Sequence, residues 1–180
     1  MSLIHRLFGM MPPEEMAGIT LRHPRWALIG RIDDPSRFLS SLHLLAPEGA
    51  WLFLEGGGHP PELLQFLEAH AGIVSPRPAL GTVWPRHTYF SLPATEEVLA
   101  SLARITSSLS SPEICDHLHV FSGENVLLEG HDAFAHTFFV SGLVSESRLK
   151  DLSAAIGCEY RALGDDDRFG RGAARGPILP

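Results

Sequence analysis

The chain has 180 residues, of which 44% are hydrophobic and 19% charged, and its formal net charge is −7. This composition is typical of a globular protein of one domain, or of two small packed ones, and excludes a largely disordered chain. The acidic balance argues against nucleic-acid binding, because a phosphate-binding face requires a basic excess.

Cysteine content and apolar runs indicate the compartment. Cys115 and Cys158 are too few for a disulfide framework; they could pair, but we expect two buried free thiols in a reducing environment. The N-terminal apolar segment is too short and interrupted for a signal peptide, and no run approaches the roughly 20 apolar residues of a membrane span. The sequence therefore predicts a cytoplasmic protein with no membrane segment.

Three regions are expected along the chain. Residues 1–24 are predicted to form a short helix or docking arm, because apolar residues at helical spacing are followed at once by Pro12 and Pro13. Residues 25–163 are predicted to form a single α+β domain. Residues 164–180 have the composition of a disordered tail.

Within the domain, apolar strands alternate with capped helices. Strands are predicted at residues 26–32, 50–55, 87–92, 115–121, 126–131, 137–141 and 158–163. The predicted helices open at a proline or a capping residue, namely Pro35, Pro60, Thr95 and Ser145.

This order predicts an α+β two-layer sandwich with a mixed, largely antiparallel sheet. The half at 86–163 resembles a ferredoxin-like, split β-α-β arrangement. The half at 25–85 has the same order of strand, turn and capped helix, which suggests a degenerate duplication. Ordinary connections between strands and helices produce that order too, so an unduplicated domain stays an alternative.

The two strands at 115–121 and 126–131 form a predicted hairpin, and its turn decides which side chains meet. Alternate residues of a strand share a face, so a shift of one residue exchanges the faces. An even turn places Leu118 opposite Glu129. An odd turn, with Ser122 opposite Val126, gathers the apolar residues on one face: Leu118, Val120, Val126 and Leu128. Burial favours the odd turn.

With the odd turn, His117 faces His131 and His119 faces Glu129 on the other side of the sheet. Opposed Cβ atoms lie about 4.5–5.5 Å apart, so these side chains form a ligand set suited to zinc or another divalent metal. Supporting polar residues are expected from neighbouring positions: Asp116, Asp132 and His136. The simpler alternative is the water-exposed face of an antiparallel sheet; a metal-free catalytic histidine is a third, without an evident nucleophile.

A glycine-rich turn between a strand and a helix is the second candidate site. Its expected ligand-binding residues are Glu55, Gly57, Gly58 and His59. Such a turn offers backbone N–H groups to an anion, but the known phosphate-binding glycine patterns are absent. A tight turn that needs positive φ explains the glycines equally well.

Two functions are weighed. The first is a small acidic binding protein without catalysis, which recognises a protein partner or a small ligand as an inhibitor or immunity-type protein does. The alternative is a metal-binding protein or metal-dependent enzyme that uses the His/Glu cluster. The sequence favours the first, because a binding protein requires no particular set of catalytic or metal-binding residues.

Overall fold

The computed structural model describes residues 13–164, so the helix predicted before Pro12 and the predicted tail beyond Gly164 lie outside the described residues. The described part of the N-terminal arm forms a short helix, α2 (Pro13–Met16), and then an irregular segment that leads to the first strand. No helix among residues 13–164 is long and apolar enough to cross a membrane.

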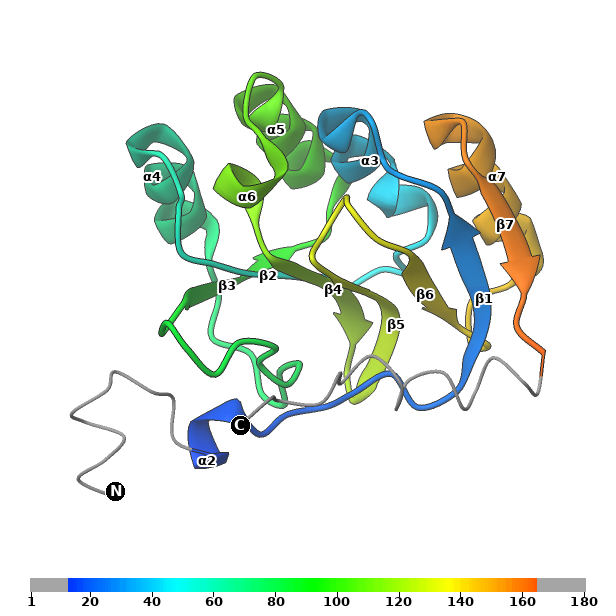
Figure 1. The fold of residues 1–180 in the computed structure, drawn as a ribbon, viewed down its shortest axis with the longest axis horizontal. Coiled ribbons are helices and arrows are strands. Elements are labelled where there is room, and N and C mark those ends of the chain that lie inside the picture. The colour runs from blue at the N-terminus through cyan, green and yellow to red at the C-terminus, as the bar shows by residue number, and fades with distance from the viewer. Residues whose placement is uncertain (1–12, 165–180) are drawn as a thin grey trace, which may run out of the picture.

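Seven strands form one sheet (Figure 1). They are β1 (Pro24–Ile29), β2 (Trp51–Gly56), β3 (Thr88–Pro93), β4 (His117–Ser122), β5 (Asn125–His131), β6 (Phe138–Ser141) and β7 (Glu159–Ala162). Their order across the sheet is β3-β2-β4-β5-β6-β1-β7, and each neighbouring pair is antiparallel.

The predicted α+β fold is confirmed, but the expectation of a mixed sheet is wrong for the strands that the structure describes. Helices do connect strands of like direction, from β3 to β4 and from β6 to β7. Another strand lies between the members of each pair, β2 in the first and β1 in the second. No parallel pair therefore forms between strands, and strands of the first half are interleaved with strands of the second.

The helices pack against one face of the sheet (Figure 1). They are α3 (Pro35–Ser41), the 3₁₀ turn η1 (Leu42–Leu44), α4 (Pro61–His70), α5 (Glu96–Thr106), α6 (Ser111–Ile114) and α7 (Glu146–Ile156). Three helices have N-caps, since side chains of Asp34, Thr95 and Ser145 accept the backbone N–H three residues further on. Gly157, with φ of +70°, ends α7 in the left-handed region.

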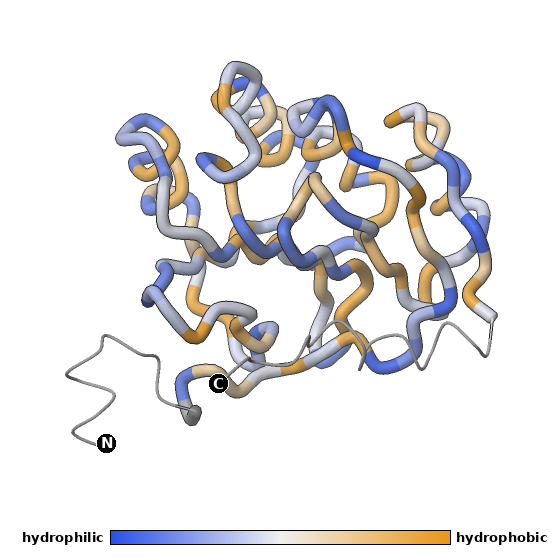
Figure 2. The backbone as a smooth tube through the Cα atoms, in the orientation of Figure 1, coloured by the Kyte–Doolittle hydropathy of each residue, from blue (hydrophilic) through white to orange (hydrophobic). Residues whose placement is uncertain are grey.

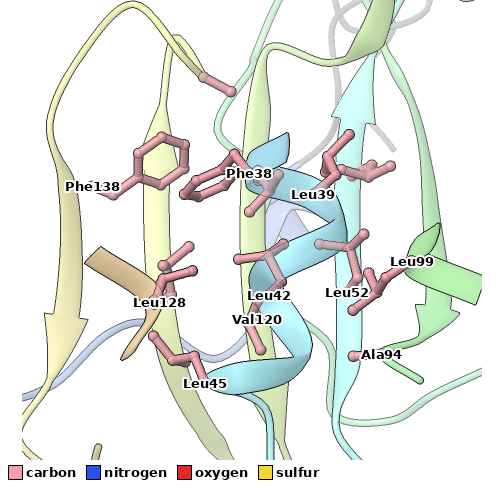
Figure 3. Packing of buried hydrophobic residues seen from close by; sticks show 14 of the residues in the cluster. Phe38, Leu39, Leu42, Leu45, Leu52, Ala94, Leu99, Val120, Leu128 and Phe138 are labelled. Carbon is pink, nitrogen blue, oxygen red and sulfur yellow. The ribbon is translucent and has the colours of Figure 1, made fainter. Parts of the chain in front are cut away.

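The larger apolar core lies between this helical layer and the sheet. Apolar residues recur on the strands and helices that meet there (Figure 2). Phe38, Leu39 and Leu42 of the segment from α3 to η1 are fully buried and lie over side chains of several strands, among them Leu52 and Leu128 (Figure 3). Burial of large apolar side chains at this spacing is what fixes the helical layer on the sheet.

The other face of the sheet carries a smaller apolar cluster and is covered by two segments. The cluster consists of Leu21, Phe53, Leu80, Phe121 and Val126. Its covering residues are the arm at 13–23 and the α4–β3 connection at 71–87, which together we call the cover. In Figure 1, α2 and this connection lie on the side of the sheet opposite the other helices. The part of the second face that carries this cluster, on β2, β4 and β5, is therefore covered by protein.

Both cysteines are free, and they differ in burial. Cys115 is buried in the larger core, and burial raises the pKa of its thiol far above the ordinary value, with the charge of Asp116 acting in the same direction. Burial also raises the pKa of Cys158, which is only half-buried. The thiolate is the reactive form, so both cysteines should react more slowly than an ordinary thiol, and Cys115 more slowly than Cys158.

We therefore expect iodoacetamide to label Cys158 first in the native protein at pH 8, and Cys115 only when the protein unfolds. Mass spectrometry of the labelled peptides over time measures both rates. Cys158→Ser should leave a native protein that takes up almost no label. Equal labelling rates for the two thiols would show that the burial of Cys115 is wrong.

Candidate metal centre

The β4–β5 hairpin places histidine and glutamate side chains opposite one another. His117 pairs with His131, and His119 pairs with Glu129. These are the two pairs that the odd turn predicted, but the turn itself is different. Ser122 pairs with Asn125, so the turn has two residues, and Gly123 at its first position has φ of +54°.

A β-bulge restores the alternation that a two-residue turn would have lost. Val120 pairs with Leu128 whereas Phe121 pairs with Val126, so Leu127 is an extra residue on β5. The bulge corrects one part of the predicted face. Val126 does not join Leu128 in the larger core but belongs to the smaller cluster under the cover, and Leu127 takes a place in the larger core.

Three of the four predicted ligands form a group able to hold a metal ion. One donor atom each from His119, Glu129 and His131 lies within 4.8 Å of the other two. His119 is 3% exposed and Glu129 8%, whereas the side chain of His131 is 49% exposed. The group therefore extends from the buried part of the sheet face to its rim, where solvent can reach it.

His119 lies in surroundings that suit a ligand. Burial lowers the pKa of His119 to about 3, against the opposing effect of the Glu129 carboxylate, so the imidazole is neutral at pH 7. The neutral form is the one that binds metals. Its Nδ1 atom is buried and has no hydrogen-bond partner. An unsatisfied buried polar atom costs about 1–3 kcal/mol, and a metal ion bound at Nδ1 would recover part of that cost.

His117 lies behind the group rather than in it. Its Nδ1 is 3.2 Å from Nδ1 of His131, and its Nε2 is 3.0 Å from the hydroxyl oxygen of Thr82. Nε2 of His131 is 3.3 Å from Oε1 of Glu129. If Nε2 of His131 binds the metal, its Nδ1–H donates to Nδ1 of His117, and Nε2–H of His117 donates to Thr82. These two hydrogen bonds fix the tautomers of both rings. Hydrogen-bond partners orient metal-binding histidines in this way.

Backbone N–H groups from both segments of the cover donate hydrogen bonds to carboxylates on this face of the sheet. Glu55 is 1% exposed, and its two oxygens accept the backbone N–H of Gly81 at 2.7 Å and of Thr82 at 2.8 Å. Oε2 of Glu129 accepts the backbone N–H of Leu21 at 3.2 Å. Sequence reasoning missed these three cover residues, and the only signal in the chain is a glycine at position 81.

Gly81 is required by its neighbour. A Cβ atom at this position would lie 2.4 Å from Cδ2 of His117, well inside van der Waals contact. The glycine therefore lets the backbone of the connection lie directly against the imidazole ring. Burial lowers the pKa of His117, and the charge of Glu55 opposes that effect.

The second predicted site does not assemble as one unit. Glu55 points to the face under the cover, whereas His59 packs on the other side against Phe90, with ring centroids 5.8 Å apart. Gly57 and Gly58 are exposed at the turn. Nδ1 of His59 lies 3.3 Å from the carbonyl oxygen of Glu113, and burial lowers the pKa of this histidine.

The expected supporting residues have other partners. Asp116 lies 3.3 Å from Nδ1 of His87, without the alignment of a hydrogen bond, and Asp132 lies 3.8 Å from Nε2 of His136. The two aspartates act on His117 through their charge alone, since each raises its pKa.

Comparison with protein families, characterised proteins and solved structures finds no match for this chain.

The hydrogen-bond chain through His117 gives a test of its role. We expect His117→Ala to weaken zinc binding about 10- to 100-fold, the usual effect of losing a partner that orients a ligand. His119→Ala, which removes a candidate ligand, should abolish binding. Competition with a zinc-sensitive dye measures both, and His70→Ala, on an exposed part of α4, is the matched control.

Cobalt spectra separate orientation from ligation. The visible bands of cobalt-loaded His117→Ala should keep the intensity of the wild type, because the three ligands remain. Visible bands that lose intensity or shift in cobalt-saturated His117→Ala would make His117 a ligand and contradict this assignment.

Proposed function

We propose that this chain is a cytoplasmic metal-binding protein that holds zinc at His119, Glu129 and His131. The observation that supports this most strongly is the convergence of three donor atoms within 4.8 Å around a buried histidine whose Nδ1 has no hydrogen-bond partner. The two free thiols fit a reducing compartment.

The donor set favours zinc over calcium or magnesium. Two imidazoles and one carboxylate match the nitrogen and oxygen ligands of zinc sites, whereas calcium and magnesium prefer oxygen alone. Three protein ligands are the pattern of catalytic rather than structural zinc sites, because a fourth position stays open for water or substrate. The exposed side of His131 is where that position would meet solvent.

Such a centre can support hydrolysis, because zinc lowers the pKa of its bound water to about 7. Glu55 does not serve as the general base in this proposal. Both of its oxygens are engaged by backbone N–H groups of the cover, at 2.7 Å and 2.8 Å. The proposed function is therefore metal binding, with hydrolysis as the chemistry that the open position would allow.

Recognition of a protein partner, in an inhibitor or immunity-type role, is a second candidate. One observation favours it: large apolar side chains are exposed at and beside the edge strand β3, namely Ile73, Val83, Trp84 and Tyr89. Exposed apolar groups at an unpaired sheet edge are typical of association surfaces. Recovery of one stoichiometric partner from the native host by wild type, and its loss in Trp84→Ser, would support this role; identical recovery with both would contradict it.

The ferredoxin-like description and the duplication also remain proposals. The support for the first is that α5 connects β3 to β4 across β2, and α7 connects β6 to β7 across β1; both connections lie within residues 86–163 and do not bear on a duplication of residues 25–85. Both connections bridge one intervening strand, as the split β-α-β motif does.

Metal content tests the main proposal. Protein purified without a histidine tag and reconstituted with zinc should retain one ion per chain, measured by elemental analysis after desalting. Free zinc at 100 times its dissociation constant should stabilise the fold by about 2.7 kcal/mol, which thermal unfolding reports. Both effects should disappear in His119→Ala and persist in His43→Ala. Wild-type protein that retains no zinc, and whose unfolding zinc does not shift, would rule the proposal out.

A further inference from the structure

The cover reaches the proposed metal ligands at two points. At the first, Glu129 accepts the N–H of Leu21 through Oε2, while its Oε1 lies beside Nε2 of His131. One carboxylate thus serves both the metal group and the arm. At the second point, Thr82 of the connection lies at the end of the chain of hydrogen bonds that runs through His117 to His131.

The two parts of the cover are also joined to each other. Ile19 donates its N–H to the carbonyl of Arg77 and accepts the N–H of Ala79, both at 2.9 Å. The guanidinium of Arg77 donates to the carbonyl of Glu15, and Arg86 forms an ion pair with the Glu15 side chain at 3.0 Å. These bonds hold the arm and the connection together, so we expect their two contacts with the metal group to act together.

The cover also closes apolar surface. Leu21 of the arm and Leu80 of the connection are buried in the smaller cluster with Phe53, Phe121 and Val126 of the sheet. If the cover lifts, these side chains meet water. The position of the cover therefore decides whether this apolar face of the sheet is buried or exposed to solvent.

We propose that metal binding and docking of the cover are coupled, so that the ion controls exposure of this face. The inference rests on the proposed metal site. If the ion binds Oε1 of Glu129, it would hold the carboxylate with Oε2 toward Leu21. Coordination through Nε2 of His131 leaves its Nδ1–H as the donor that sets His117 and Thr82. Coupling is reciprocal, so a displaced cover must weaken metal binding by the same factor.

Hydrogen exchange of the wild-type protein with and without zinc is the first test. Zinc should slow exchange in peptides that cover residues 13–23 and 76–87, and leave α7 unchanged. If the protein retains zinc but these peptides exchange at the same rate with and without zinc, the coupling is overturned and the proposed function stands. A chain that retains no zinc overturns both.

A glycine remote from the ligands provides the reciprocal test. In Gly18→Ala the new Cβ would lie 2.4 Å from the carbonyl oxygen of Arg77 and 2.5 Å from the backbone nitrogen of Ala79, so arm and connection must separate. The matched control is Gly142→Ala, whose Cβ has its nearest neighbour at 3.5 Å.

Since coupling typically amounts to about 5- to 150-fold, we expect Gly18→Ala to weaken zinc binding at least about fivefold, and Gly142→Ala to bind as wild type does. A Gly18→Ala protein whose cover exchanges faster, but whose zinc affinity is unchanged, overturns the coupling. If this variant does not fold, the exchange measurement on the wild-type chain decides.

Discussion

One extra residue on β5, Leu127, sets the register on which the candidate site depends. At the bulge β5 has one residue more than β4, because Leu127 has no partner of its own, and beyond it His119 faces Glu129 and His117 faces His131. A regular two-residue hairpin would turn these side chains to opposite faces of the sheet. The same bulge keeps Leu127 and Leu128 in the larger core. One backbone irregularity thus lets these leucines pack under the helices and brings the polar side chains together on the opposite face.

The second constraint is the burial of charge. A carboxylate removed from water is costly unless hydrogen bonds replace its hydration. Glu55 and Glu129 receive these bonds from the backbone of the cover, at Gly81, Thr82 and Leu21. The cover is thus held by polar contacts as much as by its apolar residues. His119 differs, because its buried Nδ1 has no hydrogen-bond partner, and one nitrogen of the same ring lies within 4.8 Å of the two other donors of the group.

Sequence reasoning predicted the strand–helix order, the helix caps and both opposed pairs of the hairpin, because each depends on residues close together in the chain. It missed the bulge, for which no residue type on β5 is diagnostic, and reached the right pairs through the wrong turn. It also missed the cover. Leu21 lies 108 residues from Glu129, and Thr82 lies 35 from His117, so local patterns cannot report these contacts. The water-exposed sheet face, favoured from the sequence, is wrong for His119 and Glu129, because the cover buries them.

X-ray absorption at the zinc edge tests most directly whether His119, Glu129 and His131 bind zinc, since it reports the atoms around the metal without reference to activity. Zinc-loaded protein should show nitrogen and oxygen neighbours at about 2.0–2.2 Å, with the outer-shell scattering of two imidazoles and no sulfur. His131→Ala should reduce that pattern to one imidazole. A first shell that contains sulfur at about 2.3 Å, or one that His119→Ala and His131→Ala leave unchanged, would place the metal elsewhere and contradict a zinc site at these residues.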